Sequence, residues 1–313
     1  MARIPPAVAA VRLAVRRVLP AGGPVLVACS GGADSLALAA AARFVGSSVG
    51  LVTVDHGLQA GSAGRATEVA GWASSAGFDP VIVETVSVAG LPGGPEAAAR
   101  TARYGALSAA AARTGAAAVL LGHTRDDQAE TVLLALARGA GPRGLAGMPA
   151  RKGIFLRPLL EVARADTRKA CAALGLVPWE DPHNSDPAFA RSRVRASALP
   201  ALVEALGPAV VANLARSAEL IAADNEELDR LAARALGSAA DVRVADLRDL
   251  PRAIRRRVLH MWVRQLGAPG SALSHRHVAA LDALVTEWHG QGAVHLPGGI
   301  KVARAKDVLV RVP

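Results

Sequence analysis

A six-residue segment near the N-terminus combines glycines with small oxygen-bearing side chains. An apolar run at 25–29 is followed by Ser30-Gly31-Gly32-Ala33-Asp34-Ser35 and then by a leucine- and alanine-rich stretch. This order predicts a strand, a tight turn and a helix N-terminus, where the backbone N–H groups can approach an anion. We therefore expect a phosphate-binding loop, in which Asp34 is suited to hold Mg²⁺ against phosphate oxygens. The alternative is a glycine turn that Ser and Asp side chains close without a ligand.

Two further apolar runs also end in polar residues. Asp55-His56-Gly57-Leu58 follows the run at 50–54, and Gly122-His123-Thr124-Arg125-Asp126-Asp127-Gln128-Ala129-Glu130-Thr131 follows the run at 117–121. On a helix, Asp127 and Glu130 share a face, and His123 precedes Asp127 by four positions. Two carboxylates near a histidine could hold an ammonium group or a second metal ion. The alternatives stay open: Thr124 and Asp127 fit a capping box, and Asp55 and His56 could only cap their loop.

Arginines recur in two clusters of a basic chain. Arg100 and Arg103 share a helix face next to Tyr104, and arginines alternate over 191–195. The net charge of +10 and a pI near 10.9 favour a polyanionic partner, of which nucleic acid is the first candidate. An arginine-rich composition alone would have the same effect, and such clusters are usually solvated. With 3% aromatic residues, a surface that stacks many successive bases is not expected.

Short apolar runs and helical stretches alternate over the first half of the chain. The runs lie at 25–29, 50–54, 81–86 and 117–121, with a fifth at 153–156, and the helical stretches lie at 1–19, 34–45, 63–77, 95–114 and 125–138. Continuously apolar strands are typical of an α/β fold with a doubly wound parallel sheet. Ligands of such sheets bind at the carboxyl ends of the strands, where all three polar clusters are expected.

The alternation stops near Pro158, and a different organisation follows. A helical pattern runs to about Leu236, two more helical stretches cover 253–265 and 275–288, and strand-like pieces lie at 294–296 and 308–312. A chain of 313 residues is long for one core. We expect an N-terminal catalytic domain at 1–204, followed at 205–313 by a linker helix and a smaller, mainly helical domain.

Cysteine usage and hydropathy indicate where the protein works. Cys29 and Cys171 allow neither a disulfide framework nor a Cys-x-x-Cys metal site. Arginines interrupt the only N-terminal stretch that could serve as a secretory signal, and no uncharged apolar run reaches the roughly 18–20 residues of a membrane span. The expectation is a cytoplasmic protein with no membrane partner.

Because no lysine follows the glycines, the hexapeptide is not the common ATPase loop G-x-x-x-x-G-K-[ST]. It resembles the pyrophosphate loop (PP-loop) of the N-type ATP pyrophosphatases. Five stretches together resemble one family among them, the bacterial tRNA(Ile)-lysidine synthetases. They are the segment 30–35, Asp55-His56-x-Leu58, Arg100-x-x-Arg103-Tyr104, the segment 121–131, and Asp181-Pro-x-Asn184 followed by 191–195. One departure is Gln59, where the family usually has Arg; whether Arg65 replaces it is open.

The resemblance implies a two-step reaction on an isoleucine tRNA with the anticodon CAU. ATP adenylates O2 of cytidine 34, and the ε-amine of free L-lysine then attacks C2 and expels AMP, so that the codon read changes from AUG to AUA. It implies catalytic roles for Asp34, Arg103, His123, Asp127, Glu130 and Arg195. It also implies that ATP and Mg²⁺ are bound by Ser30, Gly31, Gly32, Ala33, Asp34, Ser35, Asp55, His56 and Gly122, with Asp34 as the metal ligand. A homodimer is left open.

Two other readings compete with this one. A tRNA thiolation enzyme with the same loop, such as a 2-thiocytidine synthetase, would need cysteines that this chain does not have in pairs. A nucleotide-binding protein without catalysis would not need the carboxylates Asp34, Asp127 and Glu130. ATP turnover that depends on tRNA would separate an enzyme from such a protein.

Overall fold

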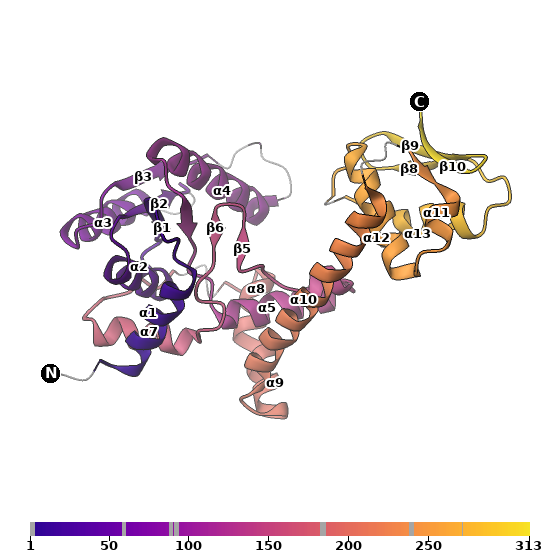
Figure 1. Cartoon of the computed structure of the whole chain (residues 1–313). Coiled ribbons are helices and arrows are strands. Elements are labelled where there is room, and N and C mark those ends of the chain that lie inside the picture. Colours follow the sequence, from indigo (N-terminus) through magenta and orange to yellow (C-terminus); the bar gives the residue numbers. More distant parts are fainter. Residues whose placement is uncertain are drawn as a thin grey trace. The chain divides into compact units, whose positions relative to one another are not determined.

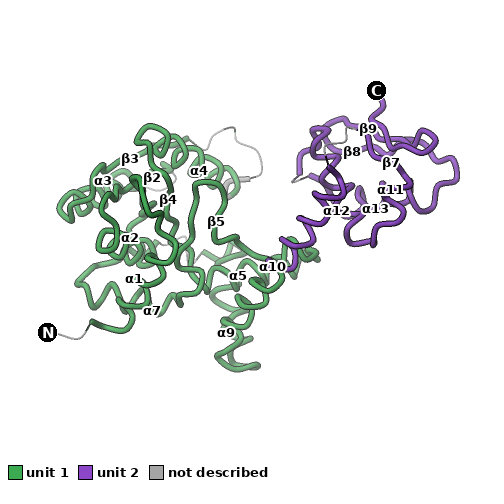
Figure 2. Tube along the Cα trace, in the orientation of Figure 1, with its two compact units in different colours: residues 1–221 green, residues 222–313 purple. Residues whose placement is uncertain are grey.

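The computed structural model describes residues 4–57, 61–87, 90, 94–181, 186–237, 241–270 and 272–313, with only the backbone at 94–96. Leu58, Gln59 and Asn184, which the sequence comparison above singles out, lie outside the described residues. The chain forms two compact units, residues 1–221 and 222–313 (Figure 2). They divide within helix α10 (Val210–Leu236), later in the chain than the expected boundary near residue 205.

A six-stranded sheet forms the centre of the first unit, and it confirms the expected α/β class. Its order is β3-β2-β1-β4-β6-β5. The strands are β1 (Val25–Ala28), β2 (Val49–Asp55), β3 (Val81–Thr85), β4 (Ala118–Leu120), β5 (Arg151–Lys152) and β6 (Phe155–Leu156). All neighbours pair in parallel except the edge pair β5–β6. Because β2 and β4 flank β1 on opposite sides, the strand order reverses at β1, where such sheets bind ligands.

Helices cover both faces of this sheet (Figure 1). Those on the sheet are α1 (Pro6–Val18), α2 (Ala33–Val45), α3 (Ser62–Ser75), α4 (Gly94–Thr114) and α7 (Arg164–Ala173). The first unit also contains α5 (Arg125–Ala137), α6 (Pro142–Leu145), α8 (Ala190–Arg193), a π-helical turn at Val194–Ala198 and α9 (Leu199–Leu206). Alternate residues of β1 point to opposite faces. Val25 and Val27 pack with α1, α2, α3 and α7, whereas Leu26 packs with Leu107 of α4. Both cysteines are free and buried, as small core residues.

The second unit combines helices with a sheet. It contains β7 (Val242–Arg243), α11 (Val244–Arg248), α12 (Arg252–Gln265), α13 (His275–Thr286), β8 (Val294–Leu296), β9 (Ile300–Ala305) and β10 (Val308–Val312). The antiparallel sheet has the order β7-β10-β9-β8. The two expected helices and the strand pieces at 294–296 and 308–312 are present. The sequence did not single out β9, which pairs with β8 through a turn where Gly298 and Gly299 adopt positive φ angles.

The described helices were also compared with the dimensions of a bilayer. No single one of them has both the length and the apolar composition of a membrane span. The pair Ala190–Leu206 and Val210–Leu236 meets both criteria only when its halves are counted together across a bend of 100°.

Candidate active site

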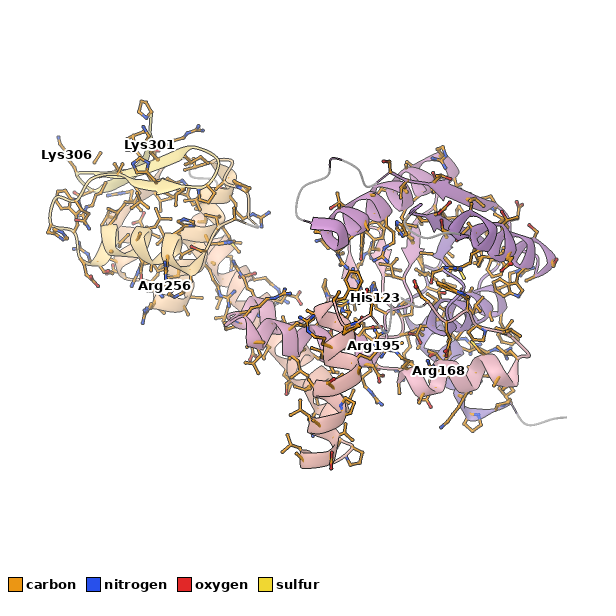
Figure 3. The ribbon with its side chains drawn as sticks, turned by 180° about the vertical axis from the view of Figure 1, so that it is seen from behind. His123, Arg168, Arg195, Arg256, Lys301 and Lys306 are labelled. Carbon is orange, nitrogen blue, oxygen red and sulfur yellow. The ribbon has the colours of Figure 1, made fainter. Side chains whose placement is uncertain are left out.

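A cavity of about 640 Å³ opens at the carboxyl ends of β1, β2 and β4. Its walls contain members of all three polar clusters, as the strand order requires. The lining includes Ser30, Gly32, Ala33, Asp34 and Ser35 from the first cluster, His56 from the second, and Gly122, His123 and Asp127 from the third. Arg103 and Arg195 also line it, whereas Gly31, Asp55 and Glu130 do not. In Figure 3, His123 and Arg195 lie close together at this site.

The phosphate-loop segment has the geometry that its glycines predict. Gly31 has a φ angle of 83°, and Gly32 is the N-cap of α2, so the loop turns directly into the helix. The hydroxyl of Ser35 donates to the carbonyl of Gly32 (2.9 Å) and fixes this turn. A Cβ atom at Gly122 would lie 3.1 Å from the amide nitrogen of Ser35. Glycine at this position therefore lets the end of β4 pack directly against the phosphate loop.

Asp34 lies in the first turn of α2 and lines the cavity. One carboxylate oxygen accepts a hydrogen bond from the hydroxyl of Thr167, and the other lies 3.6 Å from Nε of Arg164. Burial raises the pKa of Asp34, although Thr167 and Arg164 oppose the shift. Among the described residues, no three metal-ligating side chains gather into a cage. A single carboxylate beside a phosphate loop fits Mg²⁺ that is shared with phosphate oxygens, which is how this ion usually binds.

The capping-box reading of Thr124 and Asp127 is confirmed. The backbone N–H of Thr124 donates to Oδ2 of Asp127 (2.8 Å), and the hydroxyl of Thr124 accepts from the backbone N–H of Asp127 (3.4 Å). The other oxygen, Oδ1, accepts from Nη2 of Arg164 at 2.7 Å. Burial opposes ionisation of Asp127, but Arg164 and the Thr124 N–H outweigh it and hold its pKa below the usual value.

Glu130 is fully buried on the same helix. Its Oε1 accepts from Nη1 of Arg164 (3.0 Å) and from Nε of Arg195 (2.8 Å), and Oε2 accepts from Nη2 of Arg195 (3.1 Å). Nε of Arg191 lies 3.7 Å from the same oxygen. The expected carboxylate pair therefore exists, and arginines already neutralise it. A lysine ammonium group would have to replace one of these guanidinium groups, so the lysine-binding role stays a prediction.

Both histidines of the cavity have a pKa below the usual value. Burial is the main cause that lowers the pKa of His123 to about 3, and Arg103 adds to this effect while Asp127 opposes it. Burial and Arg103 likewise lower the pKa of His56. The Nδ1 atoms of both rings are buried and have no hydrogen-bond partner among the described residues. A base with so low a pKa has little tendency to take a proton from an ammonium group, so His123 is suited to hydrogen bonding.

Asp55 has a different role from the one expected. Its Oδ1 accepts from the backbone N–H of Gly57 (2.9 Å). Hydrogen bonds from Ser62 and Gly57 lower the pKa of Asp55. The loop-capping reading is therefore confirmed for Asp55, which supports His56 without lining the cavity.

Arg103 brings positive charge to the cavity. Burial lowers its pKa, and the neighbouring guanidinium groups of Arg100, Arg191 and Arg157 add to that shift. Arg157 is itself buried and donates to the hydroxyl of Tyr104 (3.1 Å). A buried cation among like charges is unfavourable until an anion joins it. Arg103 and Arg157 are therefore suited to an anionic group such as a phosphate.

Comparisons with known proteins agree with this geometry. A family model described as "PP-loop domain" matches residues 14–202, and one described as "TilS substrate binding domain" matches residues 243–310. The tRNA(Ile)-lysidine synthase of Salinispora tropica is 64% identical, over 100% of this chain and 98% of the relative. Two further enzymes of that name are similar. The one from Thermobifida fusca is 56% identical over 94% of each chain, and the one from Streptomyces coelicolor is 52% identical over 97% of this chain and 98% of the relative.

The chain belongs to the tRNA(Ile)-lysidine synthase family. The resemblance inferred from the five motifs is thereby confirmed. Among solved structures, the U34-tRNA thiolase NcsA from Methanococcus maripaludis has a TM-score of 0.55 over 69% of this chain and 78% of that chain. At 19% identity this likeness concerns the fold alone.

The structure adds residues to this lysidine synthase site that the motifs did not indicate. Arg157 follows β6, so the rule that polar residues gather at strand ends could have found it. Arg164 and Thr167 lie at the start of α7, far in sequence from their partners, and no spacing pattern indicates them. Trp179 lines the cavity, and its backbone N–H donates to the carbonyl of Gly31 (2.9 Å). The guanidinium carbon of Arg65 stacks on its ring, 2.9 Å from the centroid.

Proposed function

We propose that this chain is a tRNA(Ile)-lysidine synthetase, a ligase that forms a carbon–nitrogen bond at the expense of ATP. It converts cytidine 34 of an isoleucine tRNA with the anticodon CAU into lysidine. The observation that carries the proposal is the convergence of the phosphate loop and the 122–130 motif on one cavity. The full-length similarity to lysidine synthases supports it.

In the first step, O2 of the cytosine attacks the α-phosphorus of ATP and pyrophosphate leaves. Ser30–Ser35 and the N-terminus of α2 hold the phosphates, because backbone N–H groups and the helix dipole favour anions there. Asp34 would hold Mg²⁺, which stabilises the charge that develops on the leaving pyrophosphate. Arg103 contacts the tRNA or its activated form. The neutral rings of His56 and His123 donate or accept hydrogen bonds beside it.

In the second step, the ε-amine of lysine forms a bond to C2, the C2–O2 bond breaks, and AMP leaves with O2. Asp127 and Glu130 draw the lysine ammonium to the cavity, and it then loses a proton to water, because His123 with its low pKa is a poor acceptor. The second proton of the attacking amine also leaves to water once the bond to C2 has formed. Arg195 remains on Glu130 and keeps the buried carboxylate neutralised. The nucleophile therefore approaches from Asp127 and Glu130, while Ser30–Ser35 hold the phosphate groups of ATP.

Selection of the tRNA is assigned to the C-terminal part of the chain. We propose a catalytic domain at 1–204 and a tRNA-recognition region at 205–313, whose last part coincides with the match at 243–310. Figure 3 labels Arg256, Lys301 and Lys306, which project from different elements of this second unit. Such cations can contact the phosphates of a tRNA. The enzyme is expected in the cytoplasm, and a homodimer remains an expectation that sedimentation can test.

One experiment tests the reaction directly. The protein is incubated with ATP, radiolabelled L-lysine and an isoleucine tRNA transcript reading CAU. We expect acid-stable label in the tRNA, formed together with AMP and pyrophosphate, and no label in a methionine tRNA with the same anticodon. Turnover of ATP without lysine incorporation would favour another PP-loop chemistry, and binding of ATP without turnover would favour a non-catalytic protein.

A further inference from the structure

Arg164 contacts both the phosphate loop, through Asp34, and the carboxylates of α5. It is the first residue of α7 and lines the cavity, with 18% of its side chain exposed. Its Nη2 is 2.7 Å from Asp127, its Nη1 is 3.0 Å from Glu130, and its Nε is 3.6 Å from Asp34. One guanidinium group therefore joins the carboxylate of the phosphate loop to the two carboxylates of α5.

These contacts fill the place that an ammonium group would need. Burial alone would lower the pKa of Arg164, but Asp127, Glu130 and Asp34 outweigh it and raise that pKa. The guanidinium is therefore always charged and well neutralised. Three carboxylates of the cluster (Asp34, Asp127 and Glu130) face three arginines (Arg164, Arg191 and Arg195). Asp126 lies beside the same cluster, since its Oδ2 accepts from the backbone N–H of Arg164 (2.8 Å), so charge alone does not keep an ammonium group out. The obstacle is the position of Arg164, whose Nη atoms already contact Asp127 and Glu130.

We infer that Arg164 is a positioning residue that occupies the carboxylate pair until nucleotide binds, and then releases it to the substrate amine. The inference rests on the proposed function, since it takes Asp127 and Glu130 as the ammonium site. The release is favourable because the nucleotide phosphates, held at the loop next to Asp34, offer the guanidinium another anionic partner in the same cavity. ATP therefore binds first and prepares the site for lysine.

Arg195 reduces the free-energy cost of moving Arg164 away from Glu130. Removing every partner from a buried carboxylate is strongly unfavourable. Glu130 is fully buried, yet it keeps two hydrogen bonds from Arg195, at 2.8 and 3.1 Å, when Arg164 turns away. Asp127 likewise keeps the backbone N–H of Thr124 on its Oδ2. When Arg164 turns away, one position opens on Oε1 of Glu130 and one on Oδ1 of Asp127, which keeps only its longer contact with Nη2 of Arg195 (3.4 Å).

The consequence is a measurable coupling between the two ligands. Binding of L-lysine is measured by titration calorimetry with and without Mg²⁺ and α,β-methylene-ATP, which cannot be cleaved at the α–β bond. For the wild-type protein we expect the nucleotide to strengthen lysine binding about tenfold, within the usual range of coupling between sites. In Arg164→Gln the competing cation is absent, so the affinity for lysine should change less than about twofold on addition of nucleotide.

Two further variants complete the test. Arg164→Lys keeps the charge but cannot form the forked contact with both carboxylates, so its coupling should lie between the other two values. It also carries the test if Arg164→Gln does not fold. Arg17→Gln is the matched control, because Arg17 pairs with Glu161 at 3.5 Å on the surface; its coupling should equal that of the wild type.

Three results would overturn the inference. They are a wild-type protein without coupling, an Arg164→Gln protein with wild-type coupling, and an Arg164→Gln protein that binds nucleotide but no lysine in either state. The last result would make Arg164 a mere support of the carboxylates. Failure of the proposed function is a separate outcome, because the wild-type enzyme would then incorporate no labelled lysine into tRNA.

Discussion

Replacing Glu130 with Gln is the most direct test of the carboxylate pair formed by Asp127 and Glu130. The substitution keeps the size of the side chain but removes the charge that Arg164 and Arg195 contact at 3.0 and 2.8 Å. Breaking a buried ion pair costs about 3–5 kcal/mol when a charge is left alone. Here Arg164 keeps Asp127 and Arg195 is 29% exposed, so we expect a smaller loss, of about 1–3 kcal/mol in the free energy of unfolding.

This loss is visible in a thermal melt. For a unit of 221 residues it corresponds to a decrease of about 2–12 °C in Tm. The same protein should show a raised KM for lysine while pyrophosphate–ATP exchange continues, because ATP is held by the phosphate loop. Glu161→Gln serves as the control, since this carboxylate is 75% exposed and pairs only weakly with Arg17. A lower Tm with an unaltered lysine KM would restrict Glu130 to a structural role, and an unaltered Tm would refute the ion-pair reasoning itself.

Three other predictions concern the phosphate loop, the arginines and the buried histidine. Asp34→Asn should abolish tRNA-dependent pyrophosphate–ATP exchange with an unchanged circular dichroism spectrum; near-normal exchange would remove Asp34 from the site. Arg103→Ala and Arg195→Ala should each reduce lysidine formation at least about tenfold, as loss of 1.4 kcal/mol or more implies, whereas Arg17→Ala should not; equal mild losses would mean that only bulk charge matters. The pKa of His123 is about 3 in the folded chain and near 6.5 in an unfolded one, so the unfolded state binds the extra proton and stability falls as the pH decreases from about 6.5 to 3. Melts across this range should show a weaker pH dependence for His123→Gln than for the wild type, and parallel curves would contradict the assignment.

The strands and the meeting of the polar clusters follow from the sequence for a definite physical reason. Buried parallel strands must be continuously apolar, so the runs at 25–29, 50–54 and 117–121 stand out, and β1, β2 and β4 lie within or close to them. The edge strand β3 is only partly buried and contains Glu84. Polar residues can begin only where such a strand leaves the core. All parallel strands leave it at the same edge, and for this reason three clusters far apart in sequence line one cavity.

Other features depend on tertiary contacts that no local pattern encodes. Arg164 becomes part of the site only because α7 begins beside α5, where its backbone N–H also donates to Asp126 at 2.8 Å. The division between the units lies inside α10, and a helix that continues across it leaves no change of periodicity to mark the position. In the second unit β8 and β10 were expected, whereas β9, with Lys301 and Arg304 among its six residues, was not. These features could not be predicted for the same reason: tertiary packing determines them, and the local propensity of the residues does not.

Asp127 shows why the structural and the chemical readings of a motif need not exclude each other. Its Oδ2 closes the capping box with Thr124, and its Oδ1 faces Arg164 and the cavity. The cap fixes the rotation of the carboxylate, so that the second oxygen is held in place without any help from a substrate. An asparagine could retain the cap through its carbonyl oxygen, but its amide would then face the guanidinium with a donor instead of an acceptor. Asp127→Asn should therefore leave α5 intact while it weakens the contact with Arg164; a helix that unfolds with the substitution would show that the aspartate is needed for the cap alone.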